Sequence, residues 1–233
     1  NYIVIANETN KHIDNLKKIL DHSFQYKILI EKPISNNLQN LIAMESSKKN
    51  VFVGYNLRYH PFIQFIRKLL KNEIVLSANI YVGQYLPNWR PGRDYTYTYS
   101  SDSKLGGGVL LELSHEIDYM LYLFGKCIKG FSFVSKLSDL EINCEDSAVG
   151  ILEFEKCKQI SFNLNLLDKF GRREIILNTN KNTYKFDIYN NVMYKNEKKT
   201  TFNLNKNETY KNMHLDIINN NGQFACTVDN ATE

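Results

Sequence analysis

Three ionisable residues recur at every third position after a cluster of three glycines. They are Glu112, His115 and Asp118, in the sequence Gly-Gly-Gly-Val-Leu-Leu-Glu-Leu-Ser-His-Glu-Ile-Asp of residues 106–118. On a helix this spacing places the three side chains on one flank, whereas the leucines lie on other sides. Three ionisable groups on an otherwise apolar helix are costly to bury without partners, so the flank predicts the wall of a pocket. A histidine between carboxylates is suited to accept a proton near neutral pH.

Other interpretations of this segment differ in their chemistry. A zinc protease site would need His-Glu-x-x-His, and Tyr119 occupies the position of the second histidine, so we expect no metal here. A buried structural histidine at a domain junction is the alternative that the residues leave open. The three glycines do not match G-x-G-x-x-G, so they predict close packing of the helix start against something bound rather than a phosphate cradle.

Lys32 is the second candidate for chemistry, in the sequence Ile-Glu-Lys-Pro of residues 30–33. Because Pro33 disfavours helical geometry in the residue before it, Lys32 is expected to project from the end of a strand. A lysine there, next to Glu31, can hydrogen-bond a substrate hydroxyl and favour its alkoxide character. A solvated Lys-Pro turn is the alternative.

The elements that must position these residues alternate in the first quarter of the chain. Apolar runs that predict buried strands occupy residues 2–6, 27–30 and 51–53. Helical spacing of apolar residues marks 13–20 and 38–42. This alternation is typical of βαβ units with a parallel sheet covered on both faces. Such sheets bind ligands beyond the carboxyl ends of their strands, which directs attention to the loops 7–12, 31–35 and 55–61.

The pattern changes after Gly54. Helices are predicted over residues 62–70 and, closed by Gly125, over 109–124, with a strand over 77–86 between them. Further strands are predicted over residues 131–137, 148–154, 159–167, 174–180, 183–189 and 200–204, and a helix over 213–218. This spacing favours an antiparallel meander with Phe162, Leu164 and Leu166 on one buried face.

These elements predict an α/β plus α+β chain of two domains. The first is a partial Rossmann domain with a parallel sheet over residues 1–54. The second, over residues 55–233, is an α+β domain with an open, mostly antiparallel sheet.

Composition excludes several classes of partner. The formal net charge of +4 in 233 residues is small and dispersed, so we expect no nucleic-acid partner. No apolar run approaches the roughly 20 residues that span a bilayer, so we expect no membrane partner. The four cysteines, Cys127, Cys144, Cys157 and Cys226, form no CxxC motif and predict buried reduced thiols in a cytoplasmic protein.

Four motifs occur in a fixed order along the chain: residues 7–12 after the first strand, Glu31-Lys32-Pro33, Gly-Tyr-Asn-Leu-Arg-Tyr-His-Pro at 54–61, and the triple-glycine segment with its histidine. Together with a parallel half followed by an open sheet, they resemble the Gfo/Idh/MocA family. These oxidoreductases include glucose-fructose oxidoreductase and inositol dehydrogenase. The resemblance covers essentially the whole chain.

The resemblance implies hydride transfer between the nicotinamide of NAD or NADP and a carbinol carbon of a sugar, polyol or sugar derivative. It implies that Lys32 contacts the reacting hydroxyl and that His115 exchanges its proton, with Glu112 as a third catalytic residue. Tyr55 and Asp118 would join Lys32 and His115 around the substrate. The residues expected near the cofactor are Asn7, His12, Glu31, Lys32, Pro33, Asn56, Arg58, Trp89 and Arg90. A homo-oligomer through the antiparallel sheet is also implied.

Two departures from the family pattern accompany the resemblance. Family members commonly carry an aspartate four residues before the histidine, whereas here Glu112 lies three before it and position 111 is Leu111. This spacing motivates the alternative of a non-catalytic sugar-binding or assembly protein on the same scaffold. The sequence also has neither the Gly-rich pyrophosphate turn nor the residue that selects NAD or NADP. We therefore expect an N-terminal piece and a C-terminal helix of the family fold to lie outside it.

Overall fold

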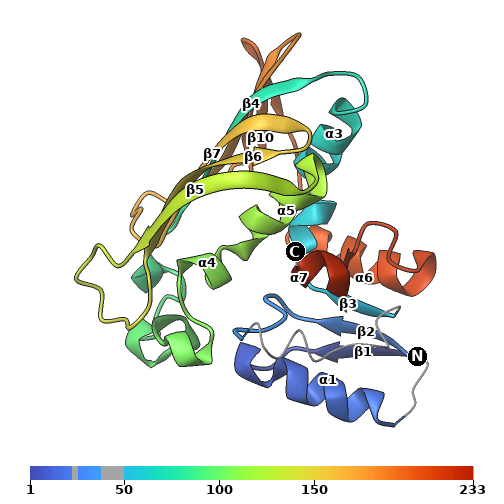
Figure 1. The fold of residues 1–233 in the computed structure, drawn as a ribbon, viewed down its shortest axis with the longest axis vertical. Coiled ribbons are helices and arrows are strands. Elements are labelled where there is room, and N and C mark those ends of the chain that lie inside the picture. Colours follow the sequence, from blue (N-terminus) through green and yellow to red (C-terminus); the bar gives the residue numbers. More distant parts are fainter. Residues whose placement is uncertain (23–25, 38–49, 233) are drawn as a thin grey trace.

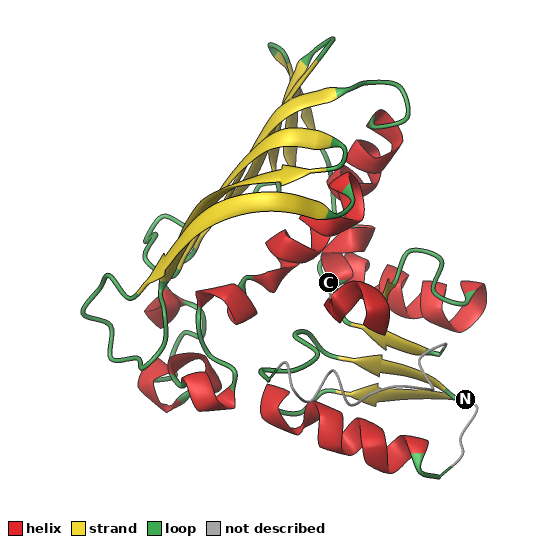
Figure 2. Ribbon diagram, in the orientation of Figure 1, coloured by secondary structure: helices red, strands yellow, loops and turns green. Residues whose placement is uncertain are grey.

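Two sheets organise the chain, a small one near the N-terminus and a large one at the other end of the molecule (Figure 1). The computed structural model describes residues 1–22, 26–37 and 50–232. Helices lie between the two sheets and against their faces (Figure 2). The predicted fold class, a parallel sheet followed by a large, mostly antiparallel one, is confirmed.

The small sheet contains the three parallel strands that the sequence predicts. They are β1 (Tyr2–Ile5), β2 (Lys27–Ile30) and β3 (Val51–Val53). Helix α1 (His12–Leu20) buries Ile13 and Leu16 in the same apolar cluster as Ile28 and Ile30. The helix predicted at residues 38–42 lies outside the described residues.

The C-terminal segment returns to the small sheet. Helix α6 (Glu208–Asn220) packs Met213 and Ile217 against Leu29 and Phe52, β12 (Cys226–Thr227) pairs antiparallel with β3, and α7 (Val228–Thr232) follows. The sequence predicted only a short helix here, because a two-residue strand and a five-residue helix carry no periodic signal. The domain boundary at residue 54 stays a prediction, and residues 208–232 pack against the first sheet.

The large sheet has eight strands in the order β11-β10-β9-β8-β4-β7-β6-β5. Their bounds are β4 (Val75–Gly83), β5 (Cys127–Ser135), β6 (Ser147–Phe154), β7 (Cys157–Asn165), β8 (Arg172–Thr179), β9 (Thr183–Asp187), β10 (Val192–Lys195) and β11 (Lys198–Thr201). The simple meander is wrong in one respect, because β4 lies between β8 and β7 and runs parallel to β7. The sequence also missed β10. The predicted buried face with Phe162, Leu164 and Leu166 is confirmed.

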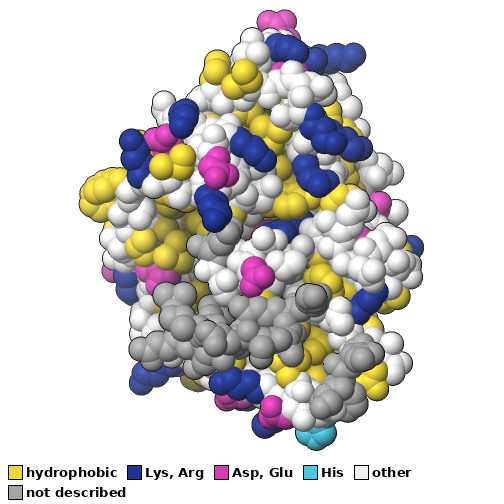
Figure 3. Space-filling view, turned by 45° about the vertical axis from the view of Figure 1, so that its right-hand side comes forward, with side chains coloured by type: hydrophobic (Ala, Val, Ile, Leu, Met, Phe, Trp, Pro, Cys, Tyr) yellow, Lys and Arg dark blue, Asp and Glu magenta, His cyan; other side chains and the backbone are white. Residues whose placement is uncertain are grey.

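One face of the large sheet is covered by helices and the other is open (Figure 2). Helix α3 (Pro61–Leu69) buries Phe62, Ile63 and Ile66 in the main apolar core. Between β4 and the helices that follow, the chain makes short 3₁₀ turns at Leu86–Asn88, Tyr95–Tyr97, Tyr99–Ser101 and Ser103–Leu105. Basic and acidic side chains are interspersed on the surface that Figure 3 displays, in agreement with the dispersed charge of the sequence.

The continuous helix predicted over residues 109–124 is wrong. Leu113 separates α4 (Val109–Glu112) from α5 (Ser114–Phe124). At this break the backbone N–H of Glu116 donates to the carbonyl of Leu113 rather than to that of Glu112. The carbonyl of Glu112 is therefore left without a helical donor, and Glu112 and His115 do not share one regular helix face.

The glycine cluster before α4 packs against the protein itself, which corrects the prediction that it contacts something bound. A Cβ atom on Gly107 would lie 2.6 Å from the carbonyl oxygen of Ser100, and one on Gly106 would lie 2.9 Å from Cβ of Thr9. The backbone carbonyl of Glu145 accepts from the N–H of Val109 and so caps the helix start. Small residues are needed here because three chain segments meet.

The cysteines are free, and three of the four are buried as predicted: Cys144, Cys157 and Cys226. Cys127 is exposed at the start of β5, so the prediction of a buried thiol is wrong there. Within the described ranges no helix is both long and apolar enough to cross a bilayer. The cytoplasmic location stays a prediction.

A buried ion pair fixes α5 to the C-terminal segment. Arg58, in the 3₁₀ turn Asn56–Tyr59, meets Asp118 with an Nη2–Oδ1 distance of 2.7 Å and an Nε–Oδ2 distance of 2.9 Å. The two side chains are only 3% and 4% exposed. Nη1 of Arg58 also donates to the carbonyl of Ala225, just before β12, at 3.3 Å. The pair therefore holds together elements from three distant parts of the sequence.

We predict that Arg58→Met lowers the free energy of unfolding by about 3–5 kcal/mol, because it leaves Asp118 buried without its partner. The control is Arg172→Met, which removes the partner of Asp168 from a surface pair whose arginine is 45% exposed and should cost at most about 1 kcal/mol. Urea unfolding followed by circular dichroism measures both. Equal losses in the two variants would contradict the structural importance of the Arg58–Asp118 pair.

Candidate active site

Lys32 leaves the end of β2 and reaches across to the helices of the large sheet. The peptide bond between Lys32 and Pro33 is cis. Nζ of Lys32 donates to the backbone carbonyl of Glu112 at 2.8 Å, the carbonyl freed by the break at Leu113. Burial lowers the pKa of Lys32, and the positive charge of Arg173 acts in the same direction, whereas nearby glutamates, Glu112 first, oppose it.

Glu112 is a buried carboxyl at the end of α4. Burial raises its pKa, while the charge of Lys32, the hydroxyl of Ser100 and the charge of Arg90 each lower it. The carboxylate therefore depends on its cationic neighbours to stay charged. The structure brings Glu112 and Lys32 together, as the sequence predicted for two residues of one site, although their roles are not tested by this geometry.

His115 lies in the first turn of α5 and is almost completely buried. Its ring contacts that of Tyr55 edge-to-face, with the centroids 5.6 Å apart. Burial holds the pKa of His115 well below its usual range, and the charges of Lys32 and Arg173 lower it further. Within the described chain Nδ1 of His115 has no hydrogen-bond partner. The residue is thus a neutral imidazole whose Nδ1 is buried without a hydrogen-bond partner among the described residues.

His12 joins the loops that follow β1 and β2. Its Nδ1 lies 2.9 Å from the carbonyl oxygen of Pro33, and its Nε2 lies 3.0 Å from the carbonyl oxygen of Asn7. In the described part of the chain, the side-chain oxygen of Asn7 is buried without a partner. These contacts give His12 a positioning role, and the Asn7 oxygen beside them is a buried acceptor without a donor among the described residues.

Glu31 lies at the same sheet edge, in close contact with the end of β3. A Cβ atom on Gly54 would lie 3.1 Å from Oε2 and 3.3 Å from Cα of Glu31, so the missing side chain of glycine eases this approach. Burial raises the pKa of Glu31, whereas the backbone and the charge of Lys32 lower it. The carboxyl ends of β1, β2 and β3 thus bring Asn7, Glu31 and Lys32 to one edge, as predicted for parallel strands.

Three predicted ligand contacts have structural partners instead. Arg58 and Asp118 pair with each other, and Asn56 donates from Nδ2 to the hydroxyl of Thr209 at 2.8 Å in the interior. The resemblance placed Arg58 and Asn56 at the cofactor and Asp118 at the substrate. Those roles stay predictions. The observed contacts of the three residues hold the C-terminal segment in place.

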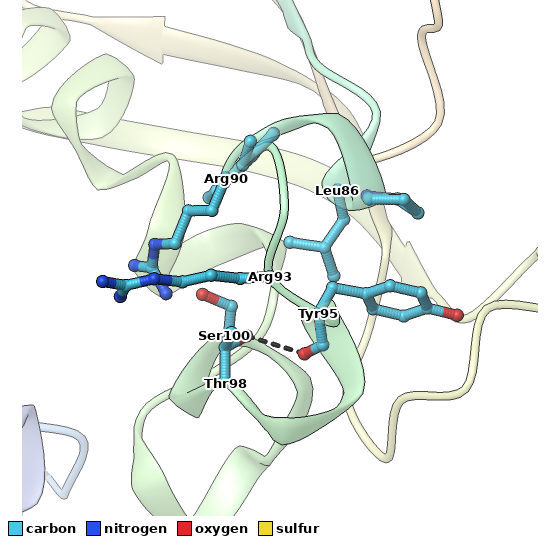
Figure 4. A pocket seen from close by; sticks show the side chains of 8 residues that line it. Leu86, Arg90, Arg93, Tyr95, Thr98 and Ser100 are labelled. Atoms are coloured by element: carbon cyan, nitrogen blue, oxygen red, sulfur yellow. Dashed lines mark hydrogen bonds between the residues drawn. The ribbon is translucent and has the colours of Figure 1, made fainter.

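Trp89 and Arg90 belong to a small pocket beside the candidate site (Figure 4). Nε1 of Trp89 donates to the carbonyl of Gln84 at 3.1 Å, and Nη2 of Arg90 donates to the hydroxyl of Tyr99 at 3.1 Å. Arg90 and Arg93 reach toward the same side of this pocket in Figure 4. Because the charge of Arg90 lowers the pKa of Glu112, the pocket borders the group of residues around Lys32.

Glu116 and Arg173 were missed as site residues by the sequence analysis. Glu116 follows His115 on α5 and is fully buried, and its Oε1 lies 2.9 Å from Nε of Arg173 on β8. A glutamate on an otherwise apolar helix signals a buried partner, but the sequence does not say which cation provides it. Among the described residues no group of three His, Cys, Asp or Glu side chains could hold a metal ion.

Comparison with known families places residues 74–185 in the GFO/IDH/MocA C-terminal domain. This part of the chain, just under half of its length, is a C-terminal domain of the Gfo/Idh/MocA type. The matched range begins just before β4 and ends within β9, so it covers most of the large sheet together with α4 and α5. No curated protein sequence matches the chain.

Solved structures share the family fold at low sequence identity. Levoglucosan dehydrogenase in complex with NADH is 13% identical with a TM-score of 0.84, over 100% of this chain and 74% of its own. The WlbA dehydrogenase from Bordetella pertussis, in complex with NADH and UDP-GlcNAcA, is 14% identical with a TM-score of 0.77, over 99% and 73%. An oxidoreductase from Thermotoga maritima is 16% identical with a TM-score of 0.79, over 98% and 71%. At these identities the likeness shows the fold.

We predict that His115 makes the protein less stable in mild acid. Since its folded pKa is depressed, the unfolded chain binds a proton below about pH 6.5 that the folded residue does not. His115→Gln should therefore reduce the loss of unfolding free energy between about pH 7 and pH 5 by about 2 kcal/mol. Urea unfolding at several pH values measures this. Parallel curves for the two proteins would show that His115 is not held neutral by burial.

Proposed function

We propose that the protein is an NAD- or NADP-dependent oxidoreductase that transfers a hydride between the nicotinamide and a carbinol carbon of a sugar, polyol or sugar derivative. One observation carries the proposal. Lys32 projects from the end of a parallel strand onto the carbonyl of Glu112, within electrostatic range of a neutral, buried His115. A proton donor and a proton acceptor are thus held at the edge where such sheets bind ligands.

The residues at this edge fit the nicotinamide end of a dinucleotide. The buried, unpartnered oxygen of Asn7 can accept from a carboxamide, and Glu31 and Pro33 border the same edge. We assign Trp89 and Arg90, which line the small pocket whose Arg90 acts on Glu112, to the same cofactor. When bound, the nicotinamide supplies the hydride acceptor or donor. Levoglucosan dehydrogenase and the WlbA dehydrogenase were both solved with NADH, which supports this choice of cofactor class.

The protein's own residues then divide the proton chemistry. In the direction of oxidation, Lys32 donates a hydrogen bond to the oxygen of the reacting hydroxyl and stabilises its alkoxide character. Burial lowers the pKa of Lys32 and so strengthens it as a donor, while Glu112 opposes loss of its charge. His115 is neutral and accepts the hydroxyl proton, because burial keeps its pKa low.

The proposal of a sugar-type substrate rests on solved structures with the same fold rather than on one side chain of this protein. Structures with this fold were solved with levoglucosan and with UDP-GlcNAcA. Tyr55 lies against His115, and the hydroxyl of Tyr99 accepts a hydrogen bond from Arg90. Tyrosine side chains, with an apolar ring and a polar hydroxyl, are suited to contact hydroxylated rings. We therefore propose Tyr55 as a substrate contact with Lys32 and His115.

We predict that Lys32→Ala and His115→Ala each lower kcat by about a hundredfold or more, because each removes a donor or acceptor at the reacting oxygen. The dissociation constant of the cofactor should stay nearly unchanged. The absorbance of the reduced nicotinamide measures turnover with a panel of aldohexoses, uronic acids, inositols and anhydro-sugars. Lys17→Ala, exposed on α1, is the control and should keep full turnover.

Undiminished turnover in both Lys32→Ala and His115→Ala would contradict the proposed roles. Binding of sugars by the wild-type protein with no turnover of any of them would favour the non-catalytic alternative. The two results are distinguishable, since the first requires a working enzyme and the second excludes one.

We propose further that the protein forms a homo-oligomer through the open face of the large sheet. Phe131 and Phe133 on β5 and Ile151 on β6 lie at neighbouring positions of this face and are 64%, 63% and 59% exposed. Large apolar side chains gathered on one uncovered face are typical of protein contacts. A second copy of the chain offers a matching face by symmetry.

We predict that Phe131→Asp lowers the mass of the oligomer in solution, because a charge at the centre of an apolar contact is desolvated without a partner. Sedimentation equilibrium measures the mass, and circular dichroism confirms that the fold is kept. Phe170→Asp is the control, since Phe170 is 84% exposed in the turn between β7 and β8. A wild-type protein that is monomeric, or an unchanged oligomer in Phe131→Asp, would rule out this interface.

A further inference from the structure

Strand β8 begins with two arginines that point to opposite sides of the sheet. Arg172 lies on the outer side, where it pairs with Asp168 at 2.8 Å. Arg173 points toward the helices and reaches Glu116, directly after His115 on α5. The second arginine thus brings a guanidinium from the large sheet to the residues that we assign to proton transfer.

The pair of Arg173 and Glu116 is unequal in its burial. The Glu116 side chain is 0% exposed, whereas that of Arg173 is 24% exposed. The Nε–Oε1 distance is 2.9 Å and the Nη2–Oε2 distance is 3.5 Å. A carboxylate this deep is costly to bury, and an apolar pair of similar size would stabilise the fold at least as well. The pair thus holds the guanidinium of Arg173 in place, while part of the Arg173 side chain stays exposed.

The guanidinium of Arg173 lies close to the candidate site, because it pairs with Glu116, the residue directly after His115. Its positive charge lowers the pKa of both Lys32 and His115, which places the guanidinium within electrostatic range of each. Burial raises the pKa of Tyr210, on α6 at the small sheet, and the charge of Arg173 opposes that rise. Contact with Glu116 involves Nε and Nη2, and a guanidinium carries five N–H donors in all. Donors therefore remain for a ligand between the two sheets.

We infer that Arg173 is a substrate-binding residue that donates from its guanidinium to an oxygen of the substrate, and that Glu116 is the positioning residue that orients it. This inference rests on the proposed function. Lys32 approaches the substrate from the small sheet and Arg173 from the large one. The site therefore requires both sheets, and the substrate is oriented by two cations of different geometry.

The oxygen that Arg173 contacts belongs either to a hydroxyl or to a carboxylate of the sugar. Both accept hydrogen bonds, and a carboxylate accepts two from one guanidinium in a planar arrangement. D-Glucose, myo-inositol and D-glucuronate separate the two sources, because only the last carries a carboxylate. A larger effect on D-glucuronate than on the neutral compounds assigns the carboxylate, and an equal effect assigns a hydroxyl.

The test uses steady-state kinetics with whichever of these three compounds the wild-type protein turns over. Arg173→Met alone would leave Glu116 buried and unpaired, so the main variant is the double replacement Arg173→Gln with Glu116→Gln, which leaves no orphaned charge. We expect its KM for the sugar to rise about ten- to a hundredfold, with a smaller change in kcat. Arg173→Lys, which keeps a charge, should raise the KM by less. Arg172→Gln on the outer side is the control.

Two further readouts separate binding from folding. Titration with NADH, followed by nicotinamide fluorescence, should give the same dissociation constant for the double variant and the wild type. A folded double variant whose KM is unchanged would overturn the inference while leaving the proposed function intact. Absence of wild-type turnover with the whole panel of aldohexoses, uronic acids, inositols and anhydro-sugars would instead contradict the proposed function, and the inference with it.

Discussion

A hydrogen bond from Lys32 joins the edge of the small sheet to the helical segment of the candidate site. Nζ of Lys32, at the end of β2, donates to the backbone carbonyl of Glu112 at 2.8 Å. This bond exists because the helical segment is interrupted at Leu113, so that the carbonyl of Glu112 is not used within a helix. The same interruption sets the start of α5, and with it the positions of His115 and Glu116. The geometry of the site therefore depends on one broken turn.

The charges of the site depend on one another because nearly all of them are buried. Burial raises the pKa of Glu112 and of Glu116 and lowers that of Lys32. Each charged form is favoured by a neighbour of opposite sign, Lys32 for Glu112 and Arg173 for Glu116. Burial lowers the pKa of His115, and the charges of Lys32 and Arg173 lower it further, so His115 stays neutral. A neutral acceptor beside a charged donor suits the removal of a hydroxyl proton in the proposed reaction.

Strands with one or two buried faces could be predicted from the sequence, because burial dictates which of their residues are apolar. The continuous apolar runs of β1, β2 and β3 and the alternation that ends in Leu164 and Leu166 each reflect one buried face. The sequence also predicted one site that contains Lys32, Glu112 and His115. Lys32 follows a predicted parallel strand, and the order of the motifs resembles that of the Gfo/Idh/MocA family. The insertion of β4 beside β7 and the return of β12 depend on partners far away in the sequence. The pairing of Arg173 with Glu116 could not be predicted for the same reason. The break at Leu113 interrupts a segment whose sequence pattern is helical throughout.

The fate of the carbinol hydrogen tests the central claim most directly. The protein is incubated with oxidised NAD or NADP and a carbon-deuterated sugar or polyol, and the reduced cofactor is analysed by proton NMR. The proposed chemistry predicts deuterium at C4 of the nicotinamide ring, on one face, with no exchange into solvent. A reduced cofactor that carries hydrogen from water, or label that is lost to solvent, would contradict direct hydride transfer at the site of Lys32 and His115.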